Sequence, residues 1–175
     1  MVASQIRRLN ESDSLTELTA LLHRAYARLA AMGLNYTAVD QSEQVTAQRI
    51  QGGICFVAEQ ADRLIGTLVL TEPNPQSFCA YFQRPQTPSV HQFAVDPQAQ
   101  DSGLGKSLLQ AAEAWALSQG FSELALDTAE PATHLIALYR KWGYEIVDHV
   151  QWPEKTYCSV VMSKQLSFEP ETEKS

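Results

Sequence analysis

A short glycine-containing segment has the most specific chemical pattern in the chain. Gln100-Asp101-Ser102-Gly103-Leu104-Gly105 lies between a stretch with strand character and a stretch with helical character. The first amides of a helix have no internal partners and carry the positive end of its dipole. Glycine lets the backbone approach an anion closely, because no Cβ is in the way. This glycine loop (residues 100–105) predicts a cradle for a phosphate or pyrophosphate, and a plain strand-to-helix turn is the alternative.

The same residues partly fit the P-loop of nucleotide triphosphatases. Gly105-Lys106-Ser107 resembles the end of the motif G-x-x-x-x-G-K-[ST], and Asp127 after an apolar run resembles its magnesium-binding carboxylate. However, Gln100 stands where that motif has its first glycine. The chain beyond the loop is also too short for the multi-stranded parallel core of those enzymes. This alternative is therefore disfavoured.

Apolar periodicity predicts the elements that position the loop. A first helix starts at a cap among residues 12–14 and ends near residue 32, before Gly33. Further helices are expected over 41–51, 104–119 and 133–142, and strands over 6–9, 54–59, 64–70, 90–95, 124–126, 144–150 and 156–162. Residues 73–88 carry four prolines and are expected to form a loop over a site.

This order of elements combines hairpins with one strand-helix-strand crossover. It predicts an α+β fold in three layers, with a mixed, largely antiparallel central sheet flanked by about four helices. Because no repeat or linker divides the sequence, a single domain is expected over residues 1–167. Residues 168–175 are polar and acidic and are expected to fray.

Composition disfavours several classes of protein. The net charge of -7 argues against a nucleic-acid binder, which needs basic patches to contact phosphates. The four histidines form no H-x₃₋₅-H pair and the three cysteines are far apart, so no metal site is expected. The sequence has no apolar run of about 18 residues and no signal-peptide pattern, so we expect a cytoplasmic protein without a membrane segment.

The glycine loop is part of a longer pattern. Gln100, Gly103 and Gly105 occupy the fixed positions of Q/R-x-x-G-x-G/A, the loop motif of the GNAT acetyltransferase superfamily. Residues 93–97, Phe-Ala-Val-Asp-Pro, resemble the strand that leads into that loop. Residues 138–144, Leu-Tyr-Arg-Lys-Trp-Gly-Tyr, resemble the LYxKxGF segment of the family. The chain therefore resembles this superfamily, most strongly over residues 89–147.

The resemblance implies a sheet whose fourth strand splays away from the fifth and receives the pantetheine arm of acetyl-CoA. The pyrophosphate is then expected on the amides of the glycine loop. The residues implied in binding acetyl-CoA are Phe93, Ala94, Val95, Gln100, Asp101, Ser102, Gly103, Leu104, Gly105, Lys106, Thr128, Thr133 and Tyr139. Asp101 departs from the family, which often has a basic residue nearby. The asparagine that commonly precedes the last helix is replaced by Ala132, so Thr128 or Thr133 is expected to substitute for it.

The resemblance also implies catalytic roles. In the family a strand amide polarises the thioester carbonyl, here that of Val95, and a helix tyrosine protonates the thiolate, here Tyr139. Ser89 stands where the family often has a glutamate base. Strand alternation predicts one face for Ser89, His91, Phe93 and Val95, so His91 is the first candidate base and Glu130 the second. Core packing for Tyr139 and a structural hydrogen bond for His91 are the alternative interpretations.

These residues predict transfer of an acetyl group from acetyl-CoA to a primary amine of a small molecule or peptide, in a ternary complex. The acceptor is expected between the first two helices, the 73–88 loop and the final strand pair. Tyr81, Phe82, Trp152 and Tyr157 are the aromatic residues expected to line it. A non-catalytic acyl-CoA-binding sensor, a longer acyl group and a hydroxyl acceptor are the alternatives. The sequence is compatible with a homodimer and does not determine the oligomeric state.

Overall fold

The computed structural model describes residues 3–167, and the predicted order of helices and strands is confirmed. The helices are α1 (Leu15–Ala31), α2 (Glu43–Gln51), α3 (Leu104–Ser118) and α4 (Thr133–Lys141). The strands are β1 (Gln5–Arg8), β2 (Ile54–Gln60), β3 (Arg63–Thr71), β4 (Ser89–Val95), β5 (Glu123–Ala129), β6 (Glu145–Val150) and β7 (Ser159–Gln165). The tail 168–175, for which fraying is predicted, lies outside the described residues.

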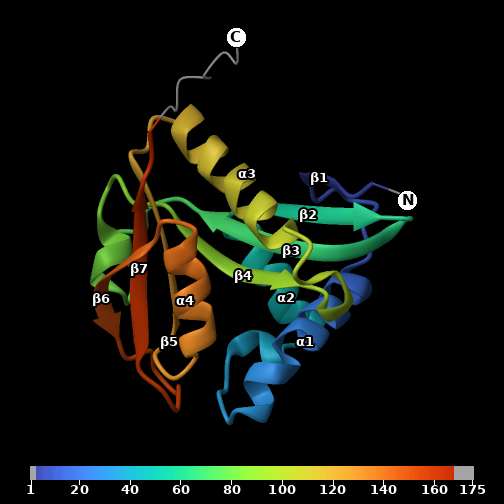
Figure 1. The fold of residues 1–175 in the computed structure, drawn as a ribbon, viewed down its shortest axis with the longest axis horizontal. Coiled ribbons are helices and arrows are strands. Elements are labelled where there is room, and N and C mark those ends of the chain that lie inside the picture. Colours follow the sequence, from blue (N-terminus) through green and yellow to red (C-terminus); the bar gives the residue numbers. More distant parts are fainter. Residues whose placement is uncertain (1–2, 168–175) are drawn as a thin grey trace.

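The strands form one mixed sheet in the order β1-β2-β3-β4-β5-β7-β6. Every neighbouring pair is antiparallel except β4 and β5, which are parallel. Leu18 and Leu21 of α1 pack on one face against β2 and β3, and Leu108 of α3 packs on the other face. The result is the predicted three-layer α+β architecture (Figure 1). Within residues 3–167 no helix combines the length and the apolar character that a membrane crossing needs.

Two strands have bounds that differ from the sequence prediction. The polar residues Asp127 and Thr128 continue β5, because they pair with Val161 and Val160 of β7. The final strand starts at Ser159, three residues or so later than the apolar pattern indicates. The preceding segment is held instead by Asn35, which donates a hydrogen bond to the Glu154 carbonyl and accepts one from the Thr156 amide. Tertiary hydrogen bonds thus override the local pattern at both positions.

The sheet splits between β4 and β5. These strands pair only at Ser89 with Ala125 and at Val90 with Leu126, and then separate. Figure 1 shows β5, β6 and β7 running in a clearly different direction from β2, β3 and β4. The predicted splay between the fourth and fifth strands is therefore confirmed.

A β-bulge in β4 corrects one prediction. Gln92 has φ 50, a rare value for a residue other than glycine, and the pairing register with β3 shifts at this point. The extra residue reverses the alternation of side chains. Phe93 and Val95 face Gly105 at the start of α3, whereas His91 contacts Phe82 on the other side. The prediction of one shared face for all four alternate residues was wrong for this reason.

The loop between β3 and β4 is tied to the sheet by one buried carboxylate, that of Glu123. It accepts hydrogen bonds from Tyr81 and Thr87 in the loop and from Ser163 on β7. Arg84 adds an ion pair at 3.3 Å. Although burial acts to raise the pKa of Glu123, these donors together lower it. Tyr81, predicted to line an acceptor site, is instead part of this anchor.

We predict that Glu123→Gln loses about 2 kcal/mol of unfolding free energy at pH 7, because buried donors lose a charged acceptor. The carboxylate's contribution is complete above its unfolded pKa of about 4.3 and is lost as the pH falls through the lower folded pKa. The difference in unfolding free energy between wild type and variant should therefore be smaller at pH 3 than at pH 7. Denaturant unfolding at both pH values measures it, with exposed Glu145→Gln as the control. An equal gap at pH 3 and pH 7 would contradict the role of the charge.

Candidate functional site

The glycine loop presents a row of free backbone donors. From Asp101 to Lys106, no amide donates a hydrogen bond to another described residue. Asp101 and Gly103 both have positive φ, 62° and 83°, which turns successive amides toward one side. The Asp101 and Lys106 side chains are exposed. The amides and the start of α3 are therefore suited to bind an anion.

The second glycine allows close packing beneath the loop. A Cβ on Gly105 would lie 3.2 Å from Trp142 of the α4 C-terminus, and within 3.6 Å of Val95 and Phe93. Phe93 stacks on Tyr139 with ring centroids 6.3 Å apart. The aromatic rings of α4 and β4 thus line the split between the strands on the α3 side. Tyr139 is buried, and burial raises its pKa, so its phenol stays protonated at neutral pH.

The freed edge of β4 carries an amide aimed into the split. Asp96 donates its amide proton to the Ile65 carbonyl of β3. Because successive amides of a strand point to opposite edges, the Val95 amide points toward the edge that β5 has left. The nearby Phe93 carbonyl accepts a hydrogen bond of 3.0 Å from the Tyr26 hydroxyl. The sequence prediction for Val95 as a polarising donor is compatible with this orientation.

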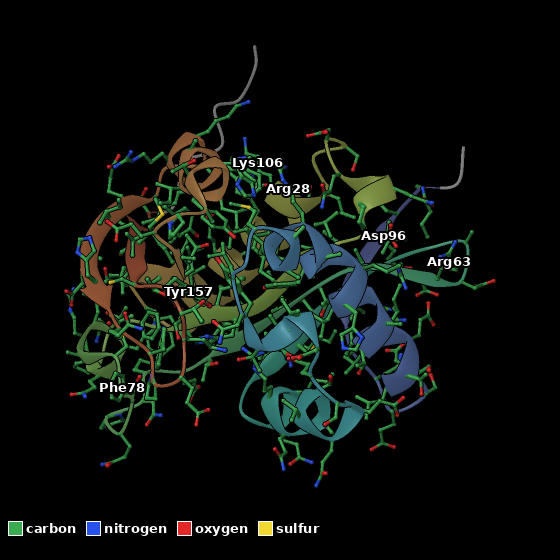
Figure 2. All side chains as sticks on the ribbon, turned by 90° about the horizontal axis from the view of Figure 1, so that it is seen from below. Arg28, Arg63, Phe78, Asp96, Lys106 and Tyr157 are labelled. Carbon is green, nitrogen blue, oxygen red and sulfur yellow. The ribbon has the colours of Figure 1, made fainter. Side chains whose placement is uncertain are left out.

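On the opposite face of the sheet, a partly buried group of charged and aromatic side chains lies near the split, and we call this group the recess. It brings together His91 of β4, Asp127 of β5 and Arg49 of α2, whose charges interact. All three side chains are half-buried. The aromatic residues around them are Tyr26, Tyr36, Phe82, Trp152 and Tyr157. Figure 2 shows Tyr157 well inside the molecule and Phe78, which contacts Trp152, at its margin.

The two titratable groups of the recess are shifted in opposite directions by the same cause. Burial, reinforced by the charge of Arg49, lowers the pKa of His91 to about 4. Burial raises the pKa of Asp127, and a 2.8 Å hydrogen bond from Trp152 Nε1 offsets part of the effect. At neutral pH His91 is neutral, and its Nε2 is hydrogen bonded to Ser89 Oγ at 2.7 Å. Burial thus weakens His91 as a base and makes Asp127 the more basic carboxylate.

The remaining predicted residues lie at different depths. Thr128 is buried and its hydroxyl is hydrogen bonded to Tyr36, whereas Thr133 is exposed at the start of α4. Glu130 is exposed on the turn after β5, so its carboxylate is not enclosed with His91 and Asp127. Ala94 packs against Leu22 of α1. Of the four aromatic residues predicted to line the acceptor site, the recess contains Phe82, Trp152 and Tyr157.

Sequence reasoning missed the two charged residues of the recess. It considered Asp127 only as a magnesium ligand and did not single out Arg49. One signal was present for Asp127, since a carboxylate ending an apolar strand is rarely placed there for stability. For Arg49 the sequence held no signal, because an arginine in an amphipathic helix is ordinarily a solvated residue.

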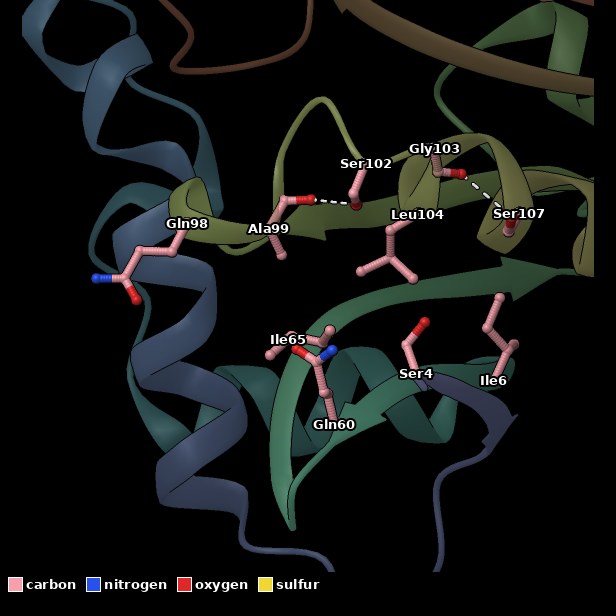
Figure 3. A pocket seen from close by; sticks show the side chains of 10 residues that line it. All are labelled: Ser4, Ile6, Gln60, Ile65, Gln98, Ala99, Ser102, Gly103, Leu104 and Ser107. Atoms are coloured by element: carbon pink, nitrogen blue, oxygen red, sulfur yellow. Dashed lines mark hydrogen bonds between the residues drawn. The ribbon is translucent and has the colours of Figure 1, made fainter. Parts of the chain in front are cut away.

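A separate hollow of about 440 Å³ lies beside the glycine loop (Figure 3). Its other walls come from β1, β2 and β3, so it lies on the outer side of the loop rather than in the split. Ser102 and Ser107 turn their hydroxyls to the carbonyls of Ala99 and Gly103. These hydroxyls are already used as donors, which leaves the loop amides as the free ones.

We predict that His91 titrates near pH 4 and stays neutral at pH 5, because the recess excludes water. Removing the charge of Arg49 in Arg49→Gln should raise this pKa. Proton-detected NMR of the imidazole from pH 3 to pH 8 measures the His91 pKa in wild type and in Arg49→Gln. The His91 signal is assigned by its absence in His91→Gln. A titration near the ordinary value of about 6.5 would show a hydrated ring and contradict the enclosed recess.

Comparison with known proteins connects this geometry to a family. The family described as "Acetyltransferase (GNAT) family" matches residues 18–144. S-(2-succino)cysteine N-acetyltransferase of Bacillus subtilis (strain 168) is 30% identical over 158 residues, which cover 89% of this chain and 91% of that protein. The residues that match the family, 18–144, include the glycine loop and Arg49, His91 and Asp127 of the recess.

Solved structures share the fold. The ribosomal-protein-S18-alanine N-acetyltransferase of Escherichia coli superposes with a TM-score of 0.71 at 19% identity, covering 97% of this chain and 98% of that one. A GNAT family acetyltransferase from Elizabethkingia anophelis, solved with acetyl-CoA bound, has a TM-score of 0.66 at 19% identity, covering 93% and 98%. The family match, the relative and the split sheet agree: the chain belongs to the GNAT family of acetyltransferases.

Proposed function

We propose that this protein transfers an acetyl group from acetyl-CoA directly to a primary amine in a ternary complex. The observation that carries the proposal is that the split between β4 and β5 is lined on both faces of the sheet. The anion-binding loop and Tyr139 lie on the α3 side, and the recess with Asp127 and His91 lies on the α1 side. Two substrates entering from opposite faces would meet at the Val95 amide.

Two features of the described residues support acetyl-CoA as the cosubstrate. The free amides from Asp101 to Lys106 suit a pyrophosphate, and the exposed Lys106 adds a positive charge beside them. The open edge of β4 suits an amide-containing arm such as pantetheine, because its backbone groups lack a strand partner. When bound, acetyl-CoA supplies the thioester that is attacked.

The protein's own groups then divide the chemistry. The Val95 amide donates to the carbonyl oxygen as negative charge develops on it. Asp127, made more basic by burial, takes the amine proton, and the lowered pKa of His91 makes the predicted histidine base the weaker candidate. Tyr139, which burial keeps protonated at neutral pH, donates its phenolic proton to the departing sulfur, and the phenolate takes a proton back from water before the next turnover. Glu130 stays a prediction for a base at the exposed turn.

An amine acceptor is supported by a relative. The Bacillus subtilis protein of 30% identity is named for N-acetylation of S-(2-succino)cysteine. We therefore propose this compound as the first acceptor to assay, followed by other amino acids and by peptide amines.

We predict that acetyl-CoA binds with micromolar affinity and that Gly103→Trp weakens binding at least about tenfold, by blocking the anion-binding amides. Gly120→Trp is the matched control. Gly120, at the other end of α3, has φ 85 against 83 for Gly103, and both have open space around the Cα. The two variants should therefore lose similar stability through backbone strain. Calorimetric titration measures affinity, and equal losses in both variants would exclude the loop as the binding site.

We predict that Tyr139→Phe lowers kcat by about 100-fold or more, with KM for acetyl-CoA changed little, because a positioned proton donor is lost. Tyr144→Phe is the control, since it removes a buried hydroxyl that bonds to Glu113 away from the split. Steady-state kinetics with the best amine measure both variants. Similar kcat values for wild type and Tyr139→Phe would remove the tyrosine from the mechanism.

A further inference from the structure

Arg49 differs from the other arginines of residues 3–167. Arg7, Arg24 and Arg84 form ion pairs with carboxylates. The other arginines without such a partner, Arg8, Arg28, Arg63 and Arg140, are exposed to water. Arg49 is half-buried and forms no ion pair with a described carboxylate. A guanidinium in a partly desolvated place without a direct ion pair is unfavourable, so Arg49 keeps the capacity to bind an anion.

A buried polar network aims this guanidinium into the recess. Arg49 donates to Gln41 Oε1 at 2.9 Å. The Gln41 amide in turn donates to Thr46 and to Gln92, the bulge residue of β4. A guanidinium has five N–H donors, and this network uses one of them in the described contacts. No hydrogen bond from the other donors to a residue of 3–167 is present, and the guanidinium interacts electrostatically with Tyr26, Asp127 and Tyr157 of the recess.

The charges in the recess are held apart. The Asp127 carboxylate interacts with Arg49 electrostatically without an ion pair, and it is bonded to Trp152 instead. Lys155 at the rim bonds only neutral oxygens of Asn35 and Thr37 in the described structure. The recess therefore offers two cationic groups and one separate carboxylate, in a chain whose net charge is -7. A molecule with an ammonium at one end and a carboxylate at the other would satisfy both.

We propose that the acceptor is an amine that also carries a carboxylate, and that Arg49 binds this carboxylate while Asp127 receives the amine. The proposal rests on the proposed function, because it assigns the acceptor class of the same reaction. A planar guanidinium binds a carboxylate with two parallel hydrogen bonds, which also fixes the orientation of the amine. Arg49 is therefore the residue that determines specificity for amino acids over neutral amines.

The test compares matched acceptors. Wild-type protein is assayed with acetyl-CoA and a panel of L-α-amino acids, their α-amides and the corresponding decarboxylated amines. We expect kcat/KM to be at least about tenfold higher for the best acid than for its amide, the usual effect of a charged hydrogen bond. Equal or better transfer to the neutral amines would overturn the proposal without any variant.

Arg49 is then changed in two ways. Arg49→Gln should lower kcat/KM for the acid by about 10- to 100-fold and leave the amide nearly unchanged, so that the preference disappears. Arg49→Lys, which keeps the positive charge, should retain part of the preference for the acid. Arg8→Gln, an exposed change on β1, should leave the preference intact. An Arg49→Gln variant that loses both activities equally would contradict the carboxylate contact, provided that acetyl-CoA still binds.

Measuring acetyl-CoA binding and acetyl transfer separately distinguishes failure of the proposed function from failure of the acceptor class. If wild-type protein binds no acetyl-CoA, the proposed function itself fails. If it binds acetyl-CoA and acetylates only amines without a carboxylate, the proposed function stands and the acceptor class is wrong. Acetyl-CoA binding without transfer to any member of the panel would also count against the acceptor class.

Discussion

The separation of β4 from β5 after two paired residues is the constraint on which the other features depend. It leaves backbone donors and acceptors without strand partners, a condition that is unfavourable unless other groups satisfy them. Tyr26 satisfies the Phe93 carbonyl on β4, and the Tyr36 hydroxyl accepts from the Ala129 amide on β5. The Val95 amide stays available for a ligand. A sheet continuous at this point would pair the Val95 amide with β5 and leave no free edge on β4.

The bulge at Gln92 organises both faces of the split. By reversing the alternation of β4, it sends Phe93 and Val95 toward the glycine loop and leaves His91 in the recess. Its side chain also accepts from Gln41, which positions Arg49. One backbone residue with positive φ therefore links the packing beneath the glycine loop to the position of Arg49 in the recess. Such a backbone conformation is commonly found where structure serves function rather than stability.

Desolvation sets the chemistry of the recess. The surrounding aromatic rings lower the pKa of His91 and raise that of Asp127 by excluding water. They also strengthen the field of Arg49. The 73–88 loop contributes Phe82, which contacts His91, and Phe78. Both phenylalanines contact Trp152 at the outer side of the recess. Because Glu123 anchors this loop to β5 and β7, the stability of the fold and the shape of the recess share one buried carboxylate.

The sequence by itself determined the order of the elements, the glycine loop and the family. Each of these depends on local signals: apolar periodicity, glycine next to a helix start, and short motifs in a fixed order. The tertiary structure alone decided the bulge at Gln92, the anchoring role of Tyr81 and the meeting of Arg49 with Asp127. The charged residues come from α2 and β5, distant in the chain, and no local pattern distinguishes Arg49 from a surface residue or links it to Asp127. Only the packing that encloses both side chains makes them a site, because desolvation is a property of the folded surroundings.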